Sequence, residues 1–280
     1  MAEKNHPLCV PEYENLTEEA RRPEEAFARL IEILKVLRRE CPWDREQTHE
    51  SLRVCMLEEA YEVVEAINTG NYENLEEELG DVFLQVLFHS SLAAESKRFD
   101  LTDVINKECD KMIRRHPHVF LREEANSIDK ALEKWENVKR REHGEASHTA
   151  RLSAVPKALP ALTRSFKIQA RAAEVGFDWD DVACAFQKID EEVSELKEAA
   201  ESKQKEKIVE ELGDLIFSAV NAARFLGVDP EEALNLTSEK FIKRFSEIEK
   251  AALASGKRLE EMSLEEMDIL WEYAKTLKND

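Results

Sequence analysis

An acidic motif occurs twice in this chain, in the same order and at the same spacing. Residues 58–62 (EEAYE) precede residues 78–81 (ELGD), and residues 191–195 (EEVSE) precede residues 211–214 (ELGD). In both copies the two blocks are 16 positions apart, from 62 to 78 and from 195 to 211. Matching order and spacing indicate an internal repeat, so we expect two tandem domains of the same fold.

Apolar residues recur at helical spacing along most of the chain. Only 7 Gly and 8 Pro interrupt this pattern, which leaves few sites for the tight turns of a sheet protein. We therefore predict an all-α fold made of two tandem helical-bundle domains. The expected helices cover residues 23–39, 48–68, 73–96, 101–115, 128–143, 157–174, 181–202, 205–226, 230–252 and 263–277.

The expected domain boundaries follow from two stretches that lack this periodicity. The chain is polar and interrupted by proline before residue 24, and the helical pattern disappears again around Gly144. We predict a flexible leader at 1–23, a first domain at 24–143, a linker at 144–153 and a second domain at 154–280. A Trp-Asp pair precedes the acidic motif in each domain, at Trp43-Asp44 and Trp179-Asp180.

Charge and cysteine content exclude several classes of function. A formal charge of −20 would repel nucleic acid and anionic membranes, and it would repel a polyphosphate unless bound cations bridge the two. No apolar run approaches the roughly 18 residues of a membrane helix, and the N-terminus lacks a secretory apolar core. Five scattered cysteines without a CxxC pair indicate reduced thiols, so we expect a cytoplasmic protein. These are Cys9, Cys41, Cys55, Cys109 and Cys184.

The repeated carboxylates have the spacing of a metal site. Helix positions three and four apart share one face, so the glutamates of residues 58–62 project together, as do Glu78 and Asp81. The short break at Thr69-Gly70-Asn71 predicts antiparallel neighbours with their acidic stretches at similar heights. Such an all-oxygen cluster suits Mg²⁺, with Mn²⁺ as a possible substitute.

The alternative reading of each acidic block is a solvated helix face. On the first helix the glutamates indeed lie opposite apolar residues such as Leu57 and Val64. The second helix argues against a solvated face, because residues 79–88 are apolar nearly all round and predict a buried helix. A carboxylate buried there costs several kcal/mol unless it is paired or binds a metal. Gly80 and Gly213 additionally suggest a close approach of backbone or ligand.

Basic residues stand close to both motifs. Lys188 and Lys207 lie four residues before Glu192 and Glu211, where they could contact phosphate or form ordinary surface ion pairs. Further downstream, a Lys and an Arg four positions apart precede a Trp in both halves. These residues are Lys111, Arg115 and Trp135 in the first half and Lys240, Arg244 and Trp271 in the second. Solvated basic faces and core tryptophans are the alternatives to nucleotide binding.

Together these motifs resemble the MazG family of nucleoside triphosphate pyrophosphohydrolases over nearly the whole chain after the leader. The resemblance is carried by CPWDREQTH at 41–49, LEEAYE at 57–62, EELGDVFLQVLFH at 77–89, RRHPHVF at 114–120, VPKALPAL at 155–162, VGFDW at 175–179 and EELGDLIFSAVNAARFLG at 210–227. It implies an all-α pyrophosphatase fold, a homodimer, and hydrolysis of ribo- and deoxyribonucleoside triphosphates to monophosphate and pyrophosphate.

The resemblance also implies roles for individual residues. The implied metal ligands are Glu59, Glu62, Glu78, Asp81, Glu192, Glu195, Glu211 and Asp214. The implied nucleotide contacts are Lys188, Lys207, Lys240, Arg244 and Trp271. The mechanism implied by these roles uses Lys188 and Lys207 to stabilise the charge of the leaving group. Glu191, and Glu58 in the first copy, would orient the attacking water.

The first copy departs from this pattern. Cys55 and Asn74 occupy the positions that Lys188 and Lys207 hold in the second copy. We therefore expect residues 151–280 to carry the stronger and broader activity.

Two other functions are compatible with parts of the sequence. A ferritin-like di-iron bundle also clusters carboxylates, but its Glu-x-x-His signature is missing here. A non-catalytic helical protein could keep the acidic site in order to bind and sequester nucleotides. Nucleotide binding without product would identify that class.

Overall fold

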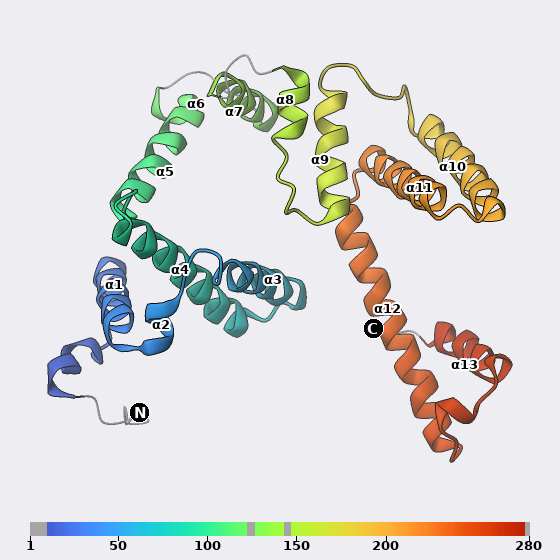
Figure 1. The fold of residues 1–280 in the computed structure, drawn as a ribbon, viewed down its shortest axis with the longest axis horizontal. Coiled ribbons are helices and arrows are strands. Elements are labelled where there is room, and N and C mark those ends of the chain that lie inside the picture. The colour runs from blue at the N-terminus through green and yellow to red at the C-terminus, as the bar shows by residue number, and fades with distance from the viewer. Residues whose placement is uncertain (1–9, 122–126, 143–146, 278–280) are drawn as a thin grey trace. The chain divides into compact units, whose positions relative to one another are not determined.

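In the computed structural model the described residues are 10–121, 127–142 and 147–277, and they contain helices but no strand (Figure 1). The expected all-α class is therefore confirmed. The chain divides into two compact units, Met1–Glu142 and His143–Asp280.

The first unit consists of seven α-helices and one 3-10 helix within its described residues. They are η1 (Pro11–Leu16), α1 (Pro23–Glu40), α2 (Pro42–Glu46), α3 (Arg53–Thr69), α4 (Tyr72–Glu95), α5 (Leu101–Arg115), α6 (Pro117–Phe120) and α7 (Ile128–Glu142).

Three short elements of this unit differ from the sequence prediction. The 3-10 helix lies within the stretch expected to be a flexible leader, and α2 and α6 begin at Pro42 and Pro117. Proline fits the first turn of a helix, since the backbone N–H that it lacks would have no partner there. The helix expected from residue 48 begins only at Arg53, because Thr48 and Ser51 bond each other's backbone in a turn (2.9 and 3.1 Å).

A small apolar core fixes the position of α4 in this unit. Leu34 of α1, Leu52, and Leu87 and Phe88 of α4 are each less than 5% exposed. The pair α3 and α4 forms an antiparallel hairpin, in which Gly70 adopts a left-handed conformation (φ 66°) and the side chain of Asn71 caps α4.

Arg38 joins three helices of the first unit. Its side chain is only 10% exposed and binds both carboxylate oxygens of Glu95 on α4, at 2.9 and 2.6 Å. The same guanidinium donates to the backbone carbonyls of Asp44, within α2, and Gln47, directly after it. This pairing lowers the pKa of the Glu95 carboxyl. One buried cation thus holds α1, α2 and α4 together.

The second unit contains six α-helices and one 3-10 helix within its described residues. They are α8 (His148–Ser153), α9 (Ala161–Ala173), α10 (Val182–Ser202), α11 (Lys205–Leu226), α12 (Pro230–Ala254), η2 (Leu259–Glu261) and α13 (Leu264–Thr276). Helix α8 occupies most of the segment predicted to be a linker, and Ser147 caps it. Helix α9 begins later than expected, directly after Pro160, which cannot donate a backbone hydrogen bond.

Helices α10 and α11 repeat the hairpin of α3 and α4. Asp181 caps α10, and Lys203 makes the turn with a positive φ of 56°. A second left-handed residue, Gly227 (φ 67°), separates α11 from α12. Helix α13 packs against the half of α12 that lies away from α11 (Figure 1).

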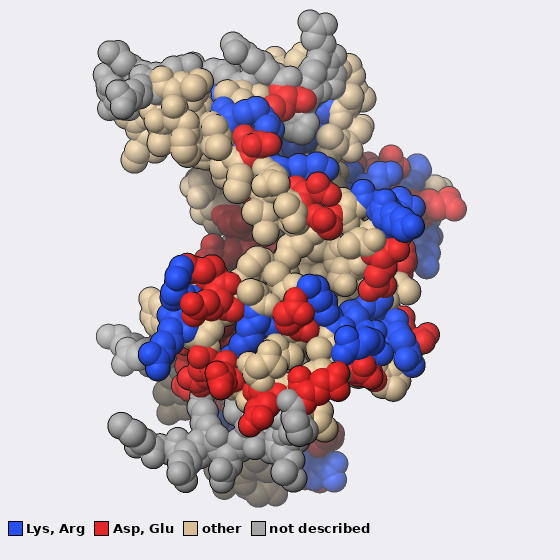
Figure 2. All heavy atoms as spheres, turned by 90° about the vertical axis from the view of Figure 1, so that its left-hand side faces the viewer, with Lys and Arg blue, Asp and Glu red and all other residues tan. Residues whose placement is uncertain are grey.

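The surface carries both signs of charge. On the face shown in Figure 2, acidic and basic side chains intermingle, so neither sign forms a continuous field there. None of the helices in the described parts of the chain is long and apolar enough to cross a bilayer.

We predict that Arg38→Met destabilises α1 and α4 by about 2–4 kcal/mol, because several hydrogen bonds of a nearly buried cation are lost. Hydrogen exchange of the amides in these helices measures the effect. The matched control is Arg39→Met, whose pair with Glu40 is exposed to solvent and should contribute little to stability. Equal protection losses in both variants would contradict the role given to Arg38.

Candidate active site

The acidic motif of the first unit forms a carboxylate cluster. Glu59 of α3 and Glu78 and Asp81 of α4 each place an oxygen within 4.8 Å of the others. Glu78 is buried, with 9% of its surface exposed. Burial, followed by the charge of Asp81, raises the pKa of Glu59, and burial followed by the charge of Glu62 raises that of Glu78.

The second unit builds the same cluster from α10 and α11. Glu192 and Glu195 of α10 and Glu211 of α11 also bring oxygens within 4.8 Å of one another. Glu192 is 3% exposed, and its Oε2 has no hydrogen-bond partner. Burial and the charges of Glu192 and Glu211 raise the pKa of Glu195.

These clusters fit a hard divalent cation. Like charges held this close repel one another, and the raised pKa values of Glu59, Glu78 and Glu195 are consequences of that repulsion and of burial. A cation would reverse the effect, and all-carboxylate donors suit Mg²⁺ or Mn²⁺. A purely solvated acidic face does not account for Glu78 and Glu192, because both are buried.

The remaining residue of each expected ligand set lies at the edge of its cluster. Glu62 is exposed and lies outside the group formed by Glu59, Glu78 and Asp81, although its charge raises the pKa of both Glu59 and Glu78. Asp214 is exposed and lies outside the group formed by Glu192, Glu195 and Glu211. The structure thus brings together three of the four expected carboxylates in each unit.

One expectation about α4 is wrong, and the described residues of this chain do not make the close approach expected at Gly80 and Gly213. Helix α4 is not buried all round, since Leu79 and Phe83 are 52% and 45% exposed. The helices of this unit cover only one side of α4. No close neighbour occupies the space beside Gly80 or Gly213 either, because an added Cβ would meet nothing within 4 Å in the described residues.

Lys188 contacts the cluster of the second unit directly. Its ammonium lies 2.6 Å from a Glu192 oxygen and 2.8 Å from a Glu191 oxygen. These pairs raise the pKa of Lys188, so it stays protonated. Lys207 is exposed on α11, one turn before Glu211. In the first unit, Cys55 and Asn74 supply no charge at these two places.

Comparison with known proteins gives a consistent result. The family model described as the MazG nucleotide pyrophosphohydrolase domain matches residues 47–120 and 184–248. The nucleoside triphosphate pyrophosphohydrolase/pyrophosphatase MazG of Thermotoga maritima is 44% identical over 251 residues, which cover 89% of this chain and 95% of that protein. The chain belongs to the MazG family.

Other relatives agree with this assignment. The nucleoside triphosphate pyrophosphohydrolase of Escherichia coli is 40% identical over 257 residues, covering 90% of this chain and 98% of that protein. The uncharacterized protein YabN of Bacillus subtilis is 44% identical over 252 residues and is matched over 51% of its own length. Each of the two segments that match the MazG family model contains one carboxylate cluster.

The basic residues predicted to contact nucleotide downstream of each acidic motif lie on helices that carry no cluster carboxylate. In the first unit the Arg115 guanidinium lies 5.3 Å from the ring centre of Trp135 and pairs with Glu142 at 2.8 Å, while Lys111 of the same helix pairs with Glu108.

The second unit repeats this stacking. The Arg244 guanidinium lies 5.7 Å from the ring centre of Trp271, which also packs against Phe241 at 5.1 Å. Lys240 is exposed on α12. This α12–α13 arrangement is separate from the α10–α11 hairpin that carries the carboxylates (Figure 1).

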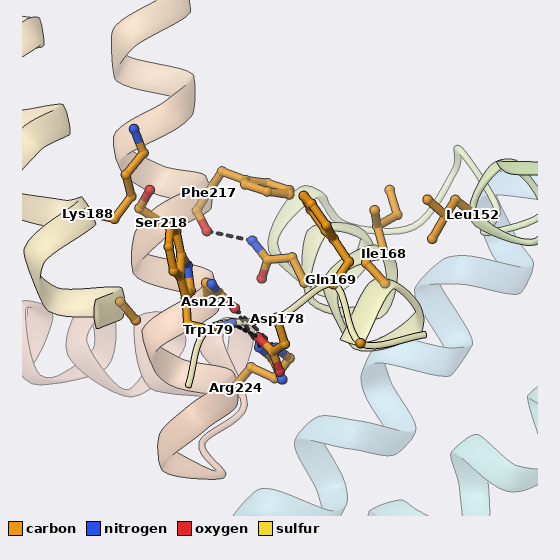
Figure 3. A pocket seen from close by; sticks show the side chains of 14 residues that line it. Leu152, Ile168, Gln169, Asp178, Trp179, Lys188, Phe217, Ser218, Asn221 and Arg224 are labelled. Atoms are coloured by element: carbon orange, nitrogen blue, oxygen red, sulfur yellow. Dashed lines mark hydrogen bonds and ion pairs between the residues drawn. The ribbon is translucent and has the colours of Figure 1, made fainter. Parts of the chain in front are cut away.

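A cavity of about 460 Å³ adjoins the cluster of the second unit. It lies among α9, the segment before α10, and α11, and Lys188 is at its border (Figure 3). Gln169, Trp179 and Asn221 line it. Sequence reasoning missed this site; the available signal was two amide side chains, Gln169 and Asn221, inside otherwise apolar helix faces.

We predict that Mg²⁺ or Mn²⁺ stabilises the protein by binding these clusters, by about 2.7 kcal/mol at a concentration one hundred times the dissociation constant. The double variant Glu78→Gln with Glu192→Gln should lose this stabilisation while keeping its metal-free melting temperature, because it removes two buried charges. Thermal unfolding with and without metal measures both effects.

The matched control is Glu76→Gln with Glu198→Gln, which changes two exposed glutamates of the same helices. The control should respond to metal like the wild type. A full response in the Glu78 and Glu192 double variant would show that the clusters are not the metal site.

Proposed function

We propose that this protein hydrolyses nucleoside triphosphates, both ribo- and deoxyribo-, to monophosphate and pyrophosphate with a bound divalent metal, and that it thereby cleans the nucleotide pool. The single observation that carries the proposal is the pair of partly buried carboxylate clusters on matching helix hairpins. Relatives named as nucleoside triphosphate pyrophosphohydrolases, at 40–44% identity over most of the chain, support it.

The metal would be Mg²⁺, or Mn²⁺ in its place. Glu59, Glu78 and Asp81 would hold it in the first unit, and Glu192, Glu195 and Glu211 in the second. Glu62 and Asp214 would complete the two ligand sets by side-chain rotation, since both stand next to these groups on the same helices. When bound, the cation would neutralise phosphate charge and lower the pKa of a water molecule.

The protein's own side chains would position the triphosphate and the water. Lys188 now pairs with Glu191 and Glu192; a metal on Glu192 would free its ammonium to contact a phosphate oxygen. Lys207, one turn before Glu211, would contact the leaving pyrophosphate. Glu191, released from Lys188, would accept a proton from the attacking water, and Glu58 would do so in the first unit.

A homodimer would complete the site. In both hairpins large apolar residues are exposed, among them Tyr61 and Phe83 in the first and Phe186 and Ile216 in the second, at 45–56%. A second copy of the chain is the occupant that fits, because the two hairpins repeat one another and a two-fold interface is self-complementary. A single-chain mass in sedimentation equilibrium would contradict this proposal.

The same second copy would bring the downstream basic residues to the phosphates. Lys240 and Arg244 lie on α12, away from the carboxylates of their own chain, and Trp271 holds the Arg244 guanidinium by stacking. Lys111, Arg115 and Trp135 would act in the same way at the first site. We further propose a cytoplasmic location and no nucleic-acid partner, on the basis of the net charge of −20 and the four described free cysteines.

The expected products are nucleoside monophosphate and pyrophosphate. Chromatography of ATP, GTP, CTP, UTP and the corresponding deoxynucleotides incubated with the protein and Mg²⁺ tests this directly. Nucleoside diphosphate with orthophosphate as the first products would refute the assignment. Tight nucleotide binding with no product would instead identify a non-catalytic binding protein.

We also predict that the second site supplies most of the turnover. Glu195→Gln in the full chain should reduce hydrolysis by one to two orders of magnitude, and Glu62→Gln should have a small effect. The reason is that each missing lysine contact at the first site corresponds to about 1.5–3 kcal/mol. Initial rates with several triphosphates measure the ranking, and the reverse order would show that Lys188 and Lys207 form surface ion pairs only.

A further inference from the structure

We propose that the cavity beside Lys188 is a nucleobase pocket, in which Gln169 and Asn221 read the hydrogen-bonding edge of the base. The proposal rests on the proposed function, since it places the base of the triphosphate whose phosphates reach the Glu192 cluster. It adds to that function a recognition site that neither the acidic motif nor the basic residues predict.

The cavity has the size and walls that a base requires. Its volume of about 460 Å³ falls within the roughly 300–1,000 Å³ of small-molecule sites. Trp179 and Phe217 line it and are 47% and 41% exposed, so each ring has a face available for a ligand. Aromatic rings of this kind bind bases by stacking, whatever the base.

Gln169 presents a hydrogen-bond acceptor to the cavity. The side chain comes from α9 and is only 8% exposed. Its Nε2 donates to the backbone carbonyl of Phe217 at 2.8 Å, which fixes the amide orientation because a carbonyl can only accept (Figure 3). Its Oε1 is buried and has no hydrogen-bond partner among the described residues. Such an acceptor is costly to leave unpaired, and an N–H group of a ligand would satisfy it.

Asn221 presents the complementary donor. Its Oδ1 accepts from Arg224, at 3.1 Å from Nε and 2.9 Å from Nη2, and Asp178 holds the same guanidinium in an ion pair. Because a guanidinium can only donate, the amide nitrogen of Asn221 points away from Arg224. One acceptor and one donor therefore line the cavity, and a base edge such as the amino group and adjacent ring nitrogen of adenine or cytosine offers the matching pair.

The cavity lies next to the carboxylate cluster that would bind the phosphates. Lys188 lines it, and the ammonium of the same residue lies 2.6 Å from a Glu192 oxygen. A nucleotide with its base between Trp179 and Phe217 would thus lead directly to the carboxylate cluster. No residue of a second chain is needed for the base, whereas the phosphates would use both.

The first unit has a different residue at the position of Asn221. Asn221 stands seven residues after Asp214, and Phe88 holds the same place after Asp81. Phe88 is 3% exposed and packs with Leu34, Leu52 and Leu87 in the core. An aromatic side chain thus occupies the position from which the second unit offers an amide. Base recognition is therefore a property of the second unit.

The decisive variant is Gln169→Leu in the full chain, with Glu62→Gln present to silence the first site. We expect KM for ATP to rise about tenfold, since one buried hydrogen bond to the base is lost, while kcat changes little. Purine riboside triphosphate, which lacks the amino group of adenine, should show no such rise. The ratio of the two KM values therefore reports on the contact to Gln169 Oε1.

Two controls separate recognition from folding. The melting temperature of Gln169→Leu should equal that of the wild type or exceed it, because the Phe217 carbonyl keeps its helical partner and an unpaired acceptor is removed. Gln204→Leu changes an exposed amide at the start of α11. It should alter neither the KM for ATP nor the KM for purine riboside triphosphate. A lower melting temperature in Gln169→Leu, with the wild-type KM ratio retained, would overturn the proposal in favour of a structural role.

A binding measurement distinguishes this proposal from the proposed function. Saturation-transfer NMR with adenosine, without phosphate or metal, should show ring contacts in the wild type and lose them in Gln169→Leu. Adenosine contacts in a protein that hydrolyses no triphosphate would refute the proposed function and keep the base pocket. Hydrolysis in which neither KM nor the NMR signal depends on Gln169 would refute the base pocket alone.

Discussion

The repulsion among clustered carboxylates is the constraint around which each unit is organised. Two antiparallel helices with a short turn bring Glu59 against Glu78 and Asp81, and Glu192 and Glu195 against Glu211. Burial and mutual repulsion disfavour the ionised form of these carboxylates and raise the pKa of Glu59, Glu78 and Glu195. The surrounding packing holds the carboxylates in place, through the Leu34 and Phe88 core and the Arg38 junction in the first unit. The packing thus holds together acidic groups whose oxygen donors fit a divalent cation.

The unpaired apolar faces have the same origin. A hairpin that directs its acidic side to a metal has one apolar side packed in its own unit and another without cover, as Leu79 and Phe83 show. In a helical bundle that remaining side requires more helices, and in the proposed homodimer a second copy would supply them without any further sequence. The same assembly would bring Lys240 and Arg244 to a site that their own chain keeps at a distance.

The two units differ in what surrounds an unchanged cluster. The carboxylates keep their order and spacing, whereas Lys188 and Asn221 in the second unit stand where the first has Cys55 and Phe88. The first unit thus has no charge at the position of Lys188 and an apolar ring at the position of Asn221. Phe88 instead contributes to the core, and a duplicated site has thus been given over to packing on one side.

The sequence by itself determined the helices, the repeat and the family. Helical periodicity is a local property, so the long helices lie within a few residues of their predicted limits; the ELGD and EExxE spacing named most of the clustered carboxylates. Only the tertiary structure decided which of these are buried, that Lys188 pairs with Glu192, and that Gln169 and Asn221 line one cavity. Gln169 and Asn221 are 52 positions apart (169 to 221) and share no pattern, because contacts between helices depend on how the helices pack and leave no local periodicity in the sequence.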